Sequence, residues 1–110
     1  MANTILKNKK IILRCANWVM EVLYNNLSEL IKEKGIDNPN ILIFISNLDQ
    51  EVFGRGFIHV DIEDYFESDQ EGLRELSSLV NDTIKRAVQE NIYSELVEEL
   101  IRKFYDQLSQ

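Results

Sequence analysis

Residues 41–63 read ILIFISNLDQEVFGRGFIHVDIE, and the class of fold depends on how this stretch folds. Its first part, Ile41–Ile45, is apolar at every position and rich in β-branched side chains, which is typical of a strand covered on both faces. From Phe57 the pattern changes to strict alternation. Ile58, Val60 and Ile62 then share one face of a strand, and His59, Asp61 and Glu63 share the other. Two strands this close along the chain are expected to pair as an antiparallel hairpin.

The connection between these two strands carries turn and bend signals. Residues 47–50 are typical of a turn, and Gly54 and Gly56, on either side of Arg55, favour a bulge or a tight bend into the second strand. A two-stranded hairpin alone is only marginally stable in water, so a third strand or a helical cover is expected. Three sources of that strand stay open: residues 3–7, Val52-Phe53, or a second copy of the chain.

The first third of the chain predicts a long amphipathic helix. Its apolar residues recur at steps of three and four: Ile11, Ile12, Cys15, Trp18, Val19, Val22, Leu23, Leu27, Leu30 and Ile31. Gly35 is well placed as a left-handed stop, and the lysines just before it suit the end of the helix dipole. Lysines near the start oppose that dipole, so residues 1–9 are frayed or form another structure. Cys15 and Trp18 are expected in the core.

Two further helices are predicted in the second half. The sequence Ser68-Asp69-Gln70-Glu71 matches a capping box, so a helix should begin there and end at Asn91. Its apolar stripe is Leu73, Leu76, Val80, Thr83, Ile84, Ala87 and Val88. The stripe of the last helix is Ile92, Leu96, Val97, Leu100, Ile101, Phe104, Tyr105 and Leu108. The expected fold is therefore one α+β domain over residues 1–110, in the order α-β-β-α-α, with the last two helices packed on the hairpin.

Charge is distributed unevenly along the chain. The formal net charge is −7, yet residues 1–34 carry a balance of +3 and residues 35–110 a balance of −10. Such a field repels phosphate backbones and attracts basic surfaces over about 8 Å at physiological salt. Nucleic-acid binding is disfavoured, and a basic protein is the expected partner.

The most acidic stretch runs from residue 61 to residue 75, where Arg74 is the one basic residue. Its carboxylates either stabilise a helix start locally or form a surface that docks a basic partner. The Tyr65-Phe66 pair favours docking because interfaces often combine aromatic anchors with charged surroundings, although Phe66 also suits the core. The candidate partner-binding residues are Asp61, Glu63, Asp64, Tyr65, Glu67, Asp69 and Glu71.

Catalytic and metal-binding signatures are weak in this sequence. His59, Asp61 and Glu63 lie at two-residue steps and could in principle hold a divalent metal, but the chain has a single His and a single Cys. The sequence does not match the patterns of a catalytic triad, a phosphate-binding loop or a calcium-binding loop. The sequence therefore predicts a protein without cofactor or metal that is not an enzyme. A metal-dependent hydrolase centred on His59 is the least favoured alternative.

Cellular location is suggested by two further features. Charged residues interrupt every long apolar stretch, so no membrane span is expected. One cysteine allows no internal disulfide, which is consistent with a reducing compartment. The expected location is the cytoplasm.

In its size, acidity and single-domain character, the chain resembles the small acidic immunity proteins that bacteria make against toxins, many of which degrade nucleic acids. That resemblance implies a protein that binds a basic toxin, such as a nuclease domain, and occludes its active site. A different class is also open. Wide apolar helix stripes would suit a structural or adaptor subunit that forms a homodimer or other homo-oligomer.

Overall fold

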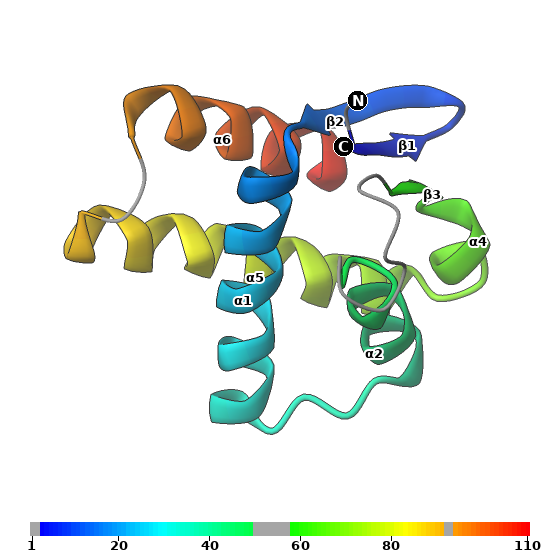
Figure 1. The fold of residues 1–110 in the computed structure, drawn as a ribbon. Coiled ribbons are helices and arrows are strands. Elements are labelled where there is room, and N and C mark those ends of the chain that lie inside the picture. The colour runs from blue at the N-terminus through cyan, green and yellow to red at the C-terminus, as the bar shows by residue number, and fades with distance from the viewer. Residues whose placement is uncertain (1–2, 50–57, 92–93) are drawn as a thin grey trace.

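The chain begins with a β-hairpin. In the computed structural model, which describes residues 3–49, 58–91 and 94–110, strand β1 (Asn3–Lys7) pairs antiparallel with β2 (Lys10–Cys15) (Figure 1). Asn8 and Lys9 join them with φ values of 53° and 65°. Left-handed values at both central residues are those of the two-residue turn that matches the twist of paired strands.

Lys9 adopts this left-handed conformation without being glycine, which carries a steric cost. Replacing Lys9 with glycine is expected to raise the free energy of unfolding by about 0.5 to 1 kcal/mol, since relief of the strain exceeds the added entropy of the unfolded chain. Urea denaturation followed by circular dichroism measures this change. The matched variant Lys10→Gly, one residue on in the regular strand, should lose stability instead.

The first long helix starts later than the sequence indicated, because β2 occupies residues 10–15. Helix α1 spans Asn17–Lys34, whereas residues 11–15 belong to β2, so the prediction of helix from Ile11 onward was wrong. Leu13 and Cys15 are buried two positions apart, as a strand requires, and Leu13 pairs with Ile5 of β1. A short apolar run is compatible with both helical and strand periodicity, and here the pairing with β1 makes residues 11–15 a strand.

The third strand, β3 (His59–Asp61), lies beside β1 and runs parallel to it. The sheet order is β2-β1-β3, so β1 is central and the sheet is mixed. Alternation from residue 58 correctly indicated a strand, and residues 3–7 were one of the three sources considered for its partner. The expected antiparallel hairpin with residues 41–45 was wrong. Val52-Phe53, Gly54, Gly56 and Phe57 lie outside the described residues.

Residues 41–45 are helical: α2 spans Pro39–Ser46. The Asn38 side chain accepts hydrogen bonds from the backbone N–H groups of Asn40 (2.9 Å) and Ile41 (3.2 Å), and Pro39 occupies the first helical position. Ile41, Phe44 and Ile45 are buried at helical spacing. Capping and burial of this face outweigh the strand preference of β-branched residues.

The other helix boundaries agree closely with the sequence. Gly35 ends α1 with φ 64°, and Asn91 ends α5 (Gln70–Glu90) with φ 55°. Helix α6 (Glu95–Ser109) is capped by Ser94, whose side chain accepts from the N–H of Val97 at 3.3 Å. Ile92, expected to belong to this helix, lies outside the described residues.

Helix α5 is the central element of the packing. It contacts α1, α2, α6 and the short helix α4 (Glu63–Phe66), while α6 also packs against β2 (Figure 1). One apolar cluster joins these helices to the inner face of the sheet. Within the described part of the chain, no helix has the length and hydropathy needed to cross a membrane.

Two residues expected in the core behave differently from one another. Cys15 is buried, and burial raises the pKa of its thiol to about 11, so the thiol stays protonated at neutral pH. Trp18 is 60% exposed, so its expected place in the core was wrong. It follows the start of α1 by one residue, and the inward positions of this turn are taken by Val19 and Met20.

Candidate functional site

The acidic stretch of residues 61–75 lies at one end of the molecule, where β3, α4 and the start of α5 follow one another (Figure 1). Glu63 begins α4, so the strand does not continue to this residue as the alternation predicted. The Oδ1 atom of Asp61 accepts the backbone N–H of Glu63 at 3.1 Å, which stabilises the change from strand to helix.

Four carboxylates of this stretch are exposed and will be called the acidic surface: Asp64, Glu67, Glu71 and Glu75. Ion pairs of the described residues lie elsewhere. Lys34 pairs with Asp82 and Arg86 with Glu33 between α1 and α5, and the remaining pairs, Arg86–Glu29, Glu98–Arg102 and Glu99–Lys103, also avoid residues 61–75. The acidic surface thus carries negative charge that no Lys or Arg of the described chain neutralises by an ion pair.

Asp69 has an internal role. Its carboxylate caps α5 by accepting the N–H of Gly72 at 2.9 Å, and it also accepts the side-chain amides of Asn38 (3.0 Å) and Asn40 (2.9 Å). These hydrogen bonds, led by the one from Asn38, hold the pKa of Asp69 below its ordinary value. The cap is therefore Asp69 and not Ser68, and Asp69 links the starts of α2 and α5.

The aromatic pair faces largely inward. Phe66 is buried, so of the two expectations for this residue, docking or core, the core is correct. Its ring packs edge-on against Phe44. Tyr65 is half-buried against the same Phe44, and its hydroxyl accepts the side-chain amide of Asn47 at 2.5 Å. Tyr65 thus offers a partner only part of its ring.

Glu63 differs from the exposed acids. Its Oε1 accepts the backbone N–H of Asn8 at 2.6 Å, whereas Oε2 is buried and has no hydrogen-bond partner among the described residues. Burial raises the pKa of the Glu63 carboxyl, Asp61 acts in the same direction, and the bond from Asn8 opposes it. This carboxylate is costly for the chain to keep charged.

His59 stands apart from Glu63. Its Nδ1 shares a hydrogen bond of 2.5 Å with Oγ1 of Thr4, its neighbour across the β1–β3 pair. In the part of the chain that the structure describes, no three His, Cys, Asp or Glu side chains gather closely enough to hold a metal ion. His59, Asp61 and Glu63 therefore do not form the cluster that their spacing made conceivable.

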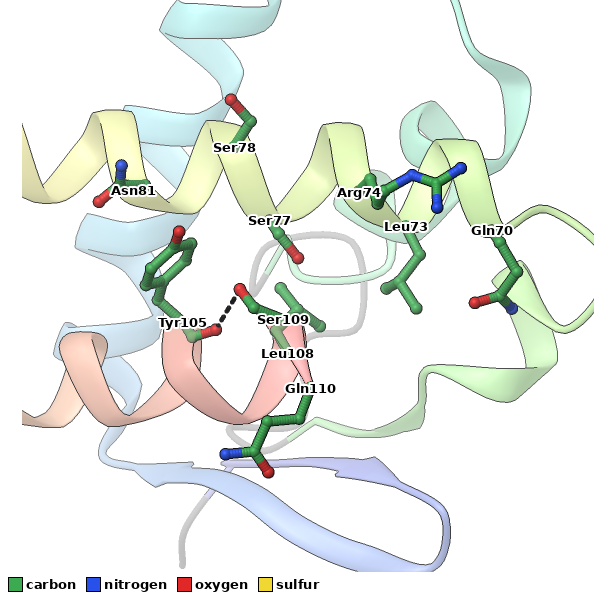
Figure 2. Close-up of a pocket in the computed structure, with 10 residues that line it drawn as sticks. All are labelled: Gln70, Leu73, Arg74, Ser77, Ser78, Asn81, Tyr105, Leu108, Ser109 and Gln110. Atoms are coloured by element: carbon green, nitrogen blue, oxygen red, sulfur yellow. Dashed lines mark hydrogen bonds between the residues drawn. The ribbon is translucent and has the colours of Figure 1, made fainter.

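A cavity of about 410 Å³ lies between α5 and α6 and will be called the α5–α6 cavity. Figure 2 shows Ser77 pointing from α5 toward α6, where Tyr105, Leu108 and Ser109 face it. The other lining residues are Gln70, Leu73, Arg74, Ser78, Asn81 and Gln110. Among the described lining residues, Arg74 has the only charged side chain.

A second cavity, of about 390 Å³, adjoins the first and will be called the Glu63 cavity. Glu63 and Glu67 line it together with Lys7, and it shares Gln70, Leu73 and Gln110 with the α5–α6 cavity. We call the two cavities together the groove. Sequence reasoning missed the groove, since its walls come from β1, α4, α5 and α6 and no local pattern joins them.

A scan against protein-family models, a search of curated proteins and a search of solved structures each returned no match.

Proposed function

We propose that this protein binds a basic toxin through its acidic surface and neutralises it by covering the active site, as an immunity-type protein does. The observation that carries the proposal is the acidic surface itself, whose exposed carboxylates form no ion pair with the described residues. Holding like charges together costs free energy that a basic partner would return on binding.

The placement of these carboxylates supports the same function. Asp64 lies on α4, and Glu71 and Glu75 lie one turn apart on α5, which packs against most of the molecule. Charges on rigid elements lose little entropy on binding and steer a basic partner from a distance. Acids positioned this way mimic substrate phosphates, which suits the occlusion of a nuclease.

The test is affinity capture from native cells, followed by functional rescue. A tagged chain should retain one basic protein at low salt and release it as salt rises. Co-expression of the chain should then restore growth to cells that make the captured protein. A captured protein whose activity and toxicity do not change in the presence of the chain would contradict neutralisation.

A self-associating structural subunit is a second candidate, favoured by exposed apolar side chains. Leu96 is 80% exposed near the start of α6, and Val88 is 52% exposed near the end of α5. Sedimentation equilibrium distinguishes this function. A stable dimer that Leu96→Glu converts to monomer supports it, whereas a monomer at high micromolar concentration rules it out.

A further inference from the structure

Two residues that line the groove each carry a buried side-chain oxygen without a hydrogen-bond partner. Among the described residues, Ser77 Oγ and Glu63 Oε2 are the buried side-chain oxygens that form no hydrogen bond. Ser77 is only 7% exposed and lines the α5–α6 cavity, whereas Glu63 lines the adjoining cavity. Buried polar groups in folded proteins nearly always have partners, so two orphans in one groove point to a bound molecule.

We propose that the groove binds an extended segment of the basic partner, with an arginine side chain in the Glu63 cavity and the segment's backbone along the α5–α6 cavity. This inference rests on the proposed function and deepens it by assigning the part of the partner that enters the protein. Each cavity falls within the size range of ordinary ligand sites.

The Glu63 end suits a guanidinium. The bond from Asn8 orients the Glu63 carboxyl group, whose Oε2 has no hydrogen-bond partner among the described residues, and exposed Glu67 adds a negative charge. The planar fork of arginine can donate to both carboxylates at once, which the ammonium of lysine does less well. Phe66 and Leu73 supply an apolar wall for the arginine stem.

The α5–α6 end suits a peptide backbone. Peptide groups present donors and acceptors in turn, and hydroxyl and amide side chains can meet both. Ser77 faces the cavity, and Ser109 donates its hydroxyl proton to the carbonyl of Tyr105 at 2.9 Å, which leaves the Ser109 oxygen free to accept (Figure 2). Arg74 extends along α5 toward Gln70 and can donate to a carbonyl of the segment (Figure 2).

Lys7 is the basic residue of the Glu63 cavity, and its charge is directed elsewhere. Its ammonium donates to the carbonyl oxygens of Gln107 (3.3 Å), Leu108 (3.0 Å) and Gln110 at the end of α6. The negative end of the α6 dipole offsets this charge. Lys7 therefore holds α6 against β1 and leaves the carboxylates of the cavity for the partner.

The test is a titration of the ¹⁵N-labelled protein with a capped pentapeptide that has one central arginine flanked by glycine and serine. We expect chemical-shift changes grouped at Glu63, Gln70 and Ser77. The same peptide with citrulline, which is neutral and nearly isosteric, should cause none. Glu63→Gln should weaken arginine-peptide binding at least fivefold, and the control Glu21→Gln, an exposed site on α1, should change it less than twofold.

A second variant separates binding from folding. Ser77→Ala removes an unsatisfied buried hydroxyl, so it should raise the melting temperature and at the same time weaken peptide binding at least threefold. A Ser77→Ala protein with unchanged affinity overturns the backbone half of the proposal. Shift changes confined to Asp64, Glu71 and Glu75, or no shift changes at all, overturn the whole groove proposal. The peptide titration tests only the groove, whereas affinity capture tests the binding of a basic toxin. A negative titration therefore leaves the proposed function to be decided by the capture experiment.

Discussion

Charge reversal at Asp64, Glu67 and Glu71 is expected to slow association with the captured basic partner by about 10- to 100-fold at low salt. These three carboxylates belong to the acidic surface and form no ion pair with the described chain. Their loss removes the field that draws the partner in, so the dependence of the association rate on salt should flatten. Stopped-flow or surface-based kinetics at several salt concentrations measures both effects.

The matched control reverses three other exposed acids, Glu21, Asp37 and Asp106. Each reversal to lysine adds two charges, so both triple variants have a formal net charge of −1 instead of −7. The control should associate within about threefold of the wild-type rate. Equal rates for the two triple variants would mean that total charge governs association and that the acidic surface has no special place. Circular dichroism of both variants confirms that they are folded.

Replacing Asn3 with leucine is expected to lower the free energy of unfolding by about 2 to 4 kcal/mol, because buried backbone groups would lose their partners. Asn3 is completely buried, and its side chain joins three segments. Its amide nitrogen donates to the Cys15 carbonyl (3.2 Å) and to Oδ1 of Asn17 (2.9 Å), and its Oδ1 accepts the N–H of Ile58 at 2.7 Å. Leucine fills a similar volume and satisfies none of these groups.

The control is Asn17→Ala, which affects only the exposed branch of this network and should cost about 0.5 to 1.5 kcal/mol. Urea denaturation of the three proteins gives both differences. A loss below 1 kcal/mol for Asn3→Leu would show that the Cys15 carbonyl and the Ile58 N–H find other hydrogen-bond partners in the variant. The predicted loss is a large share of the 5 to 15 kcal/mol that usually stabilises a domain.

The candidate site was only partly predictable from sequence. Asp64, Glu67 and Glu71 are exposed as a docking surface requires, because acids near helix starts usually face water. Asp69 and Glu63 turned inward, one to cap α5 and one to meet Asn8, whose turn lies far away in the sequence. A run of acidic residues in the sequence indicates where negative charge is concentrated. It does not indicate which carboxylates form internal hydrogen bonds, because the partners of Glu63 and Asp69 include residues of other segments.

Local chemistry in the sequence determined the helix ends at Gly35 and Asn91, the amphipathic stripes of α5 and α6, and the strand at His59–Asp61. Each of these depends on a few neighbouring residues, such as a residue that tolerates positive φ or a repeat of apolar positions. The segregation of charge along the chain is also a property of the sequence alone.

Tertiary structure decided the folding of residues 41–45 and the pairing of the sheet. In the sheet order β2-β1-β3, β3 has β1 as its partner, and residues 41–45, which the sequence predicted in that place, are not part of the sheet. With the cap at Asn38 and an apolar face to bury, this segment becomes α2. The parallel contact of Thr4 with His59 joins residues that are 55 positions apart in the chain, and only long-range packing and hydrogen bonding can select such a partner.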